Sequence, residues 1–195
     1  MKTPTEIASY MPERLSARPR DKRGLPIPYS VKMIDGLPDF RVTDARRWRL
    51  CIDCRQCALC GRLVKHSLWF VGGPLCERHR LFQDPGMHRT CAEFALRVCP
   101  FLAMSKAHYS NLERRPPPPG MAVIAGTEDM EKPDRFMLGA ASNYRVVVVE
   151  GVPFIEATPW LALHWWKDGQ RVPEETIAEY RQRKFGLKPE QGDPT

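Results

Sequence analysis

Two short motifs constrain the fold of this chain more than any other feature of its sequence: Cys57-x2-Cys60-Gly61 and His88-x2-Cys91. A Cys-x2-Cys pair followed by glycine is typical of the turn that directs two thiolates at one metal ion, because glycine tolerates left-handed backbone conformations. In the helix predicted around the second motif, two residues three apart face the same way. Two such pairs supply the four ligands of a closed tetrahedral zinc site. The sequence therefore predicts one structural Zn2+ ion.

A second pair of residues competes for the same role. Cys76 and His79 follow Cys60 with the spacing Cys-x2-Cys-x15-Cys-x2-His, which is also acceptable for zinc. Spacing alone leaves both ligand sets open. The helix predicted after residues 84–86 favours the first set, because His88 and Cys91 begin an apolar face that continues into the core.

The cysteines also have an alternative interpretation as an iron–sulfur signature, since Cys51, Cys54, Cys57 and Cys60 recur at three-residue spacing. This interpretation is disfavoured. Cys51 falls on the apolar face of a predicted helix, and Cys54 is followed by arginine instead of glycine. Cys99 lies about 12 Å beyond Cys91 along a helix, too far to share its metal ion. We expect these three cysteines to pack as small hydrophobic side chains.

The distribution of cysteines also indicates a compartment. All seven lie between residues 51 and 99, which suits a metal site better than a secreted disulfide framework. We find no export signal and no apolar stretch approaching the ~18 residues of a membrane span. The sequence therefore predicts a soluble, cytoplasmic protein without a membrane partner.

Positive charge is concentrated in the first part of the chain. Residues 1–115 carry 21 Lys+Arg against 11 Asp+Glu, whereas the remainder carries 9 against 12. This asymmetry favours a nucleic-acid or acidic partner, although a solvated surface accounts for it equally well. The candidate phosphate-binding residues are Arg18, Arg20, Lys22, Arg23, Arg46, Arg47 and Arg49.

Composition shifts divide the chain into five predicted regions. These are a basic, proline-rich arm (1–29), a zinc-binding module (30–113), a polyproline linker (114–120), a β-rich C-terminal subdomain (121–186) and a flexible tail (187–195).

Within these regions, periodicity and turn residues predict the secondary structure. Expected helices are a short one over 5–11, one capped at 43 or 44, one from 88 and one from 173. Expected strands are 29–33, 39–42, 121–125, 145–149, 152–157 and 160–166, with a further hairpin over 63–71 between the ligand pairs. A knuckle, a hairpin and a ligand-bearing helix are the parts of a treble clef. The predicted fold is therefore α+β, a treble-clef-like module followed by a β-rich part that ends in a helix.

Four segments resemble a family of uncharacterised bacterial and phage zinc proteins: CALCG, WFVGGPL, DPGMHRTCAEFALRVCPFL and ALHWWKDGQ. The resemblance covers roughly residues 40–180 and is most specific around 57–103. It implies that the metal pairs are the CxxCG and HxxCA motifs, hence Cys57, Cys60, His88 and Cys91. It implies no activity.

Two functional hypotheses follow. The first is a non-enzymatic, zinc-stabilised interaction protein that binds nucleic acid or a nucleic-acid-associated host complex, in a regulatory or host-takeover role. The second is an HNH-like metal-dependent nuclease. Such nucleases need a catalytic histidine after an acidic residue, whereas His66 follows Lys65. No small-molecule substrate is indicated, and the sequence favours a role without catalysis.

Overall fold

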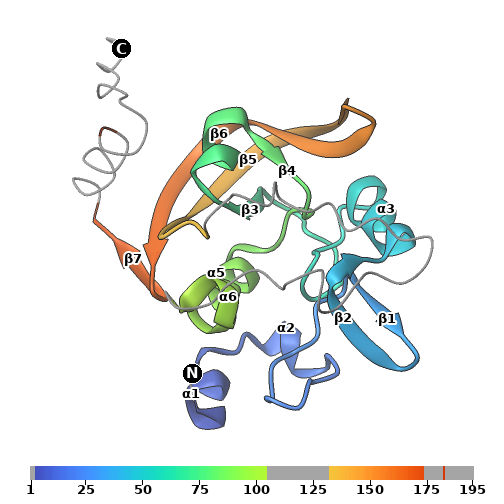
Figure 1. Ribbon diagram of the computed structural model, residues 1–195, viewed down its shortest axis with the longest axis vertical. Helices are drawn as coiled ribbons and strands as arrows, with labels where there is room; N and C mark the ends of the chain where they lie inside the picture. Colours follow the sequence, from blue (N-terminus) through green and yellow to red (C-terminus); the bar gives the residue numbers. More distant parts are fainter. Residues whose placement is uncertain (1–2, 105–131, 174–181, 183–195) are drawn as a thin grey trace.

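The computed structural model of the protein describes residues 3–104, 132–173 and 182. It combines helices with antiparallel sheets, so the mixed α and β character predicted from the sequence is confirmed (Figure 1). The helices are α1 (Pro4–Tyr10), α2 (Glu13–Ser16), α3 (Ala45–Asp53), α4 (Pro74–His79), α5 (Arg89–Val98) and α6 (Pro100–Ala103). The strands are β1 (Val31–Ile34), β2 (Leu37–Thr43), β3 (Leu68–Gly72), β4 (Leu81–Phe82), β5 (Phe136–Val149), β6 (Val152–Lys167) and β7 (Gln170–Val172).

The N-terminal segment packs against the rest of the protein. Thr3 and Glu6 form a capping box at the start of α1, in which each side chain accepts a hydrogen bond from the other residue's backbone N–H. Ile7 in α1 and Leu15 in α2 are 3% and 0% exposed. Burial of these apolar side chains therefore holds the N-terminal segment against the protein, although its composition predicts a basic arm.

Strands β1 and β2 and helix α3 form as predicted. The hairpin turns at Asp35 and Gly36, whose φ angles of 49° and 77° are those of a two-residue turn that matches the strand twist. The carboxylate of Asp44 accepts a hydrogen bond of 3.0 Å from the backbone N–H of Arg47 and so caps α3. The chain then enters the first metal-ligand motif directly.

The larger sheet joins segments that are far apart in the sequence. Its strand order is β3-β5-β6-β4, and β7 extends it by pairing with β6. Every strand pair in it is antiparallel. The predicted zinc module and the predicted C-terminal subdomain thus contribute strands to one sheet.

The hairpin predicted between the two ligand pairs does not form. Strand β3, which forms in that stretch, pairs along the whole of its own length with β5. The chain after β3 cannot return as a partner strand, because Pro74 begins helix α4 there. The strand predicted at 160–166 is likewise the second half of β6, which also contains the predicted strand 152–157.

One hydrophobic core spans both parts of the chain. Its fully buried side chains include Phe70 from β3, Met137 from β5 and Trp165 from β6. Cys57 and Cys91 belong to the same cluster and are 0% exposed. The candidate ligands are therefore built into the core of the protein.

Several predictions lie outside the described residues: the linker 114–120, the strand 121–125, nearly all of the helix from 173, and the tail 187–195. Among the described residues, no helix is both long and apolar enough to cross a membrane.

Candidate metal centre

The first ligand pair sits on a tight knuckle. The backbone N–H of Cys57 donates to the carbonyl of Arg62, and the N–H of Gly61 donates to the carbonyl of Cys57, at 2.9 and 2.8 Å. Gly61 has a φ of +77°, the left-handed conformation expected from the Cys-x2-Cys-Gly pattern. The knuckle therefore turns Cys57 and Cys60 toward the same point.

The second pair lies where α5 begins. His88 is the N-cap residue, with extended backbone angles, and Cys91 lies in the first turn of the helix. Met87, the residue before this N-cap, forms two backbone hydrogen bonds with Trp69 of β3, of 2.8 and 2.9 Å. The N–H of Ala58 also donates to the carbonyl of Gly86, at 3.2 Å, and joins the knuckle to this segment.

The four residues converge. One ligand atom from each of Cys57, Cys60, His88 and Cys91 lies within 4.8 Å of all the others. The sulfur of Cys60 and Nδ1 of His88 are 3.4 Å apart. Two ligands of a tetrahedral zinc ion with Zn–S and Zn–N bonds of about 2.3 and 2.05 Å are separated by about 3.6 Å. These residues thus lie close enough to hold a metal ion, and their donor set is compatible with zinc.

The ionisation of the three thiols also fits a cation site. Hydrogen bonds from Cys57 and Cys91 lower the pKa of Cys60, so this thiol is the first of the three to ionise. The same contacts raise the pKa of Cys91, as does burial. Three sulfur atoms this close cannot all be thiolates without a positive charge between them. A divalent cation supplies that charge and deprotonates its thiol ligands.

His88 is oriented by a contact outside the cluster. Its Nε2 lies 3.1 Å from the carbonyl oxygen of Leu63, which can only accept a hydrogen bond. Nε2 therefore carries the proton, and Nδ1 presents its lone pair to the three sulfur atoms. Such a second hydrogen bond is typical of metal-bound histidines.

An aromatic residue covers the knuckle. A Cβ atom placed on Gly61 would lie 2.7 Å from Cδ2 of Tyr29, so the ring packs directly on the turn. The guanidinium groups of Arg18 and Arg47 lie 5.7 and 5.4 Å from the centre of that ring. Burial and the charge of Arg47 lower the pKa of Arg18, whereas Cys60 acts in the opposite direction. This contact was not predictable from the sequence, since no local pattern links Tyr29 to a motif about 30 residues away.

The competing pair is elsewhere. Cys76 and His79 lie on α4 and are not part of the convergent group, the one such cluster found among the described residues. Cys76 packs against Gly72, because a Cβ atom added to Gly72 would lie 2.5 Å from the Cβ atom of Cys76. His79 is exposed at the end of the helix.

The three other cysteines also lie outside the cluster. Cys51 is buried in the core and Cys99 is half-buried at the junction of α5 and α6, whereas Cys54 is exposed, so the expectation that it packs as a hydrophobic side chain is wrong. Burial, with a smaller contribution from Cys57 and Cys60, raises the pKa of Cys51 to about 12. Cys51 therefore stays a neutral thiol at physiological pH.

The predicted phosphate-binding residues divide into two groups. The first is engaged in the fold: Arg18 donates to the carbonyl of Ile27, Arg23 pairs with Asp21, and Arg47 donates to the carbonyl of Tyr29. The second is exposed and consists of Lys22, Arg46 and Arg49, while Arg20 is exposed but also donates to the carbonyl of Gly24. Arg47, one of the candidate phosphate-binding residues, is thus held by the fold.

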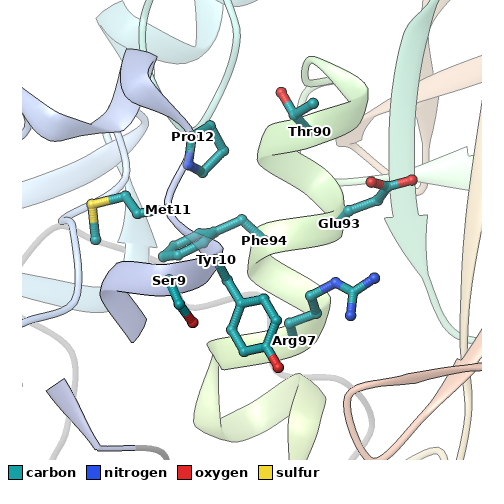
Figure 2. Close-up of a pocket in the computed structure, with 8 residues that line it drawn as sticks. All are labelled: Ser9, Tyr10, Met11, Pro12, Thr90, Glu93, Phe94 and Arg97. Carbon is teal, nitrogen blue, oxygen red and sulfur yellow. The ribbon is translucent and has the colours of Figure 1, made fainter. Parts of the chain in front are cut away.

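A hollow of about 240 Å3 lies between the N-terminal helices and α5 (Figure 2). Ligand pockets usually have volumes of about 300–1,000 Å3. Its two charged lining residues already have partners, since Glu93 pairs with Arg89 and Arg97 lies over the ring of Tyr10. We assign no ligand to this hollow.

Comparison with known proteins identifies no relative: no family model, curated protein or solved structure matches this chain.

Proposed function

We propose that Cys57, Cys60, His88 and Cys91 bind one structural Zn2+ ion in a module that has the knuckle and the ligand-bearing helix of a treble clef but not its hairpin, and that the protein is a non-enzymatic interaction protein. The observation that carries this proposal is the convergence of four nitrogen and sulfur donors within 4.8 Å of one another. Four protein ligands fill a tetrahedral zinc ion and leave no position for water or substrate. Such a site stabilises the fold instead of performing hydrolysis.

The partner we propose is nucleic acid or a nucleic-acid-bound complex. Arg46 and Arg49 are three residues apart on α3 and exposed, so they face solvent from one side of the helix. This helix leads into the knuckle, which the metal would hold rigid. Lys22 is also exposed. We extend the proposal to a regulatory role in a bacterium or phage, in line with the sequence resemblance.

Salt-dependent binding to duplex DNA and RNA tests this partner. Binding through phosphate contacts weakens with a slope of about 0.9 in log K per log salt for each phosphate neutralised on DNA. The double variant Arg46→Glu/Arg49→Glu should weaken binding to all sequences alike and reduce that slope by about 2.

The matched control is Arg78→Glu/Lys167→Glu, which changes the net charge equally at two other exposed positions. It should leave most of the binding intact. Failure of the wild type to bind at low salt would remove the nucleic-acid partner. Metal-dependent cleavage of the probe would instead favour the nuclease.

A further inference from the structure

Half of strand β5 has an open edge. Strand β3 pairs with β5 only over 137–141, so among the described residues nothing pairs with the outer side of 142–149. This segment forms a two-stranded ribbon with β6, and the loop joining the two strands lies at the periphery of the molecule (Figure 1). An exposed strand edge is a template for pairing with another chain.

The open edge is apolar. It contains four consecutive valines, of which Val146, Val148 and Val149 are 43%, 69% and 42% exposed. β-Branched side chains are favourable in paired strands, and exposed β-branched runs are unusual on an edge facing water. The exposed apolar area and the unpaired backbone groups therefore coincide.

Backbone hydrogen bonds show which amides face outward. The N–H of Tyr144 donates to the side-chain oxygen of Asn143, at 2.9 Å, and so does not pair with β6. Successive residues in an antiparallel ladder direct their N–H groups to opposite sides. Val146 and Val148 therefore also present their N–H groups on the open edge.

The other edge of the ribbon is protected. Pro153 of β6 pairs in register with Val148 of β5, and proline has no N–H to offer a further strand. Farther along β6, the N–H of Ala157 donates to the carbonyl of Arg80 beside β4. One side of the ribbon is thus blocked and covered, whereas the β5 side carries neither proline nor lysine.

We propose that a second copy of this chain pairs with β5, antiparallel and about a twofold axis at Val147. This register places Val146 opposite the partner's Val148 and Val147 opposite its own symmetry mate, so valines meet valines. Both outward-facing valine amides then find hydrogen-bond acceptors. The interface closes on itself and produces a dimer.

Charge favours a second copy in this orientation. Arg145 precedes the four valines and Glu150 follows them. In the proposed register Arg145 lies opposite Val149 of the second copy and one residue from its Glu150, whereas in-register parallel pairing would place each charge beside its like. Within its own ribbon Arg145 also pairs with Glu156 of β6, on the side away from the open edge.

Sedimentation equilibrium of the full-length protein tests the proposal. We expect a mass twice the 22.4 kDa of one chain. Val148→Pro removes one outward N–H without touching the ladder to β6, so it should give a monomer with an unchanged circular dichroism spectrum. Val148→Thr is the matched control, because it keeps both the amide and the β-branched shape and should remain a dimer.

Three outcomes would overturn the proposal: a monomeric wild type at every concentration, a Val148→Pro variant that remains dimeric, or an assembly larger than a dimer. If Val148→Pro fails to fold, the variant Val146→Lys/Val148→Lys replaces it, since two like charges on each edge oppose pairing. This inference is independent of the metal centre, and its outcome leaves the proposed zinc site untouched.

Discussion

The knuckle region and the β5–β6 sheet are stabilised in different ways, although they share one core. At the knuckle, three thiols and an imidazole are brought together in the protein interior, which is costly unless a cation compensates. In the sheet, large apolar side chains such as Trp165 and Met137 are fully buried. The first region therefore depends on an ion and the second on apolar burial, and the two can be perturbed separately.

Removal of the metal should have the largest effect. Structural zinc contributes apparent binding free energies of about 10–16 kcal/mol in zinc-finger peptides at neutral pH, and this energy is coupled to folding. We expect a chelator to increase amide hydrogen exchange strongly in residues 57–103. The ribbon at 142–156, which is distant from the ligands in the sequence, should respond less. Equal protection with and without chelator would contradict this expectation.

A cavity in the sheet should destabilise the protein less than metal removal does. It should affect the sheet and leave the metal centre intact. Ile155 is 0% exposed, and truncating a buried isoleucine to alanine costs about 2–5 kcal/mol. Chemical denaturation of Ile155→Ala should show this loss while the metal content stays unchanged. Leu161→Ala on the same strand is the control, since Leu161 is 58% exposed and the change should cost little. Loss of metal from Ile155→Ala would show that the two regions are not separable.

Alanine substitutions at two glycines test how closely Tyr29 packs on the knuckle. Gly61→Ala forces a side chain into a left-handed conformation and against the ring of Tyr29, whereas Gly24→Ala, at φ +80°, meets no atom within 4 Å. A strained backbone conformation costs about 1–3 kcal/mol. Gly61→Ala should therefore be more destabilising than Gly24→Ala in thermal unfolding, and should weaken metal retention. Equal losses would argue against the tyrosine contact.

Thiol reactivity should show the smallest effect. Cys51 and Cys54 are three residues apart, but the first is 2% exposed with its pKa raised to about 12, and the second is exposed. Because the thiolate is the reactive species, iodoacetamide should modify Cys54 well before Cys51. Mass spectrometry of peptides from the labelled protein measures the order. Labelling of Cys54 should release no metal, because this residue lies outside the cluster.

The sequence was informative where the determinants are local. Residues three apart set the knuckle and the ligand-bearing helix, and Asp35-Gly36 and Asp44 set a turn and a cap. The partner of β3 was not predictable, because β5 lies nearly 70 residues away and strand pairing leaves no local signature. The same holds for the hydrogen bond between His88 and Leu63. The absence of a local hairpin could have been anticipated from Pro74, which favours a helix start over a returning strand.

Metal analysis of purified single variants shows which residues hold the ion. We expect one zinc ion per chain in the wild type, and the same in Cys76→Ser and His79→Ala. The variants His88→Ala and Cys91→Ser should lose the ion, because three remaining ligands leave the tetrahedral site open and buried charge uncompensated. Release of the metal from Cys76→Ser and His79→Ala with retention in His88→Ala and Cys91→Ser, or a wild type that binds no zinc, would contradict the zinc site at Cys57, Cys60, His88 and Cys91.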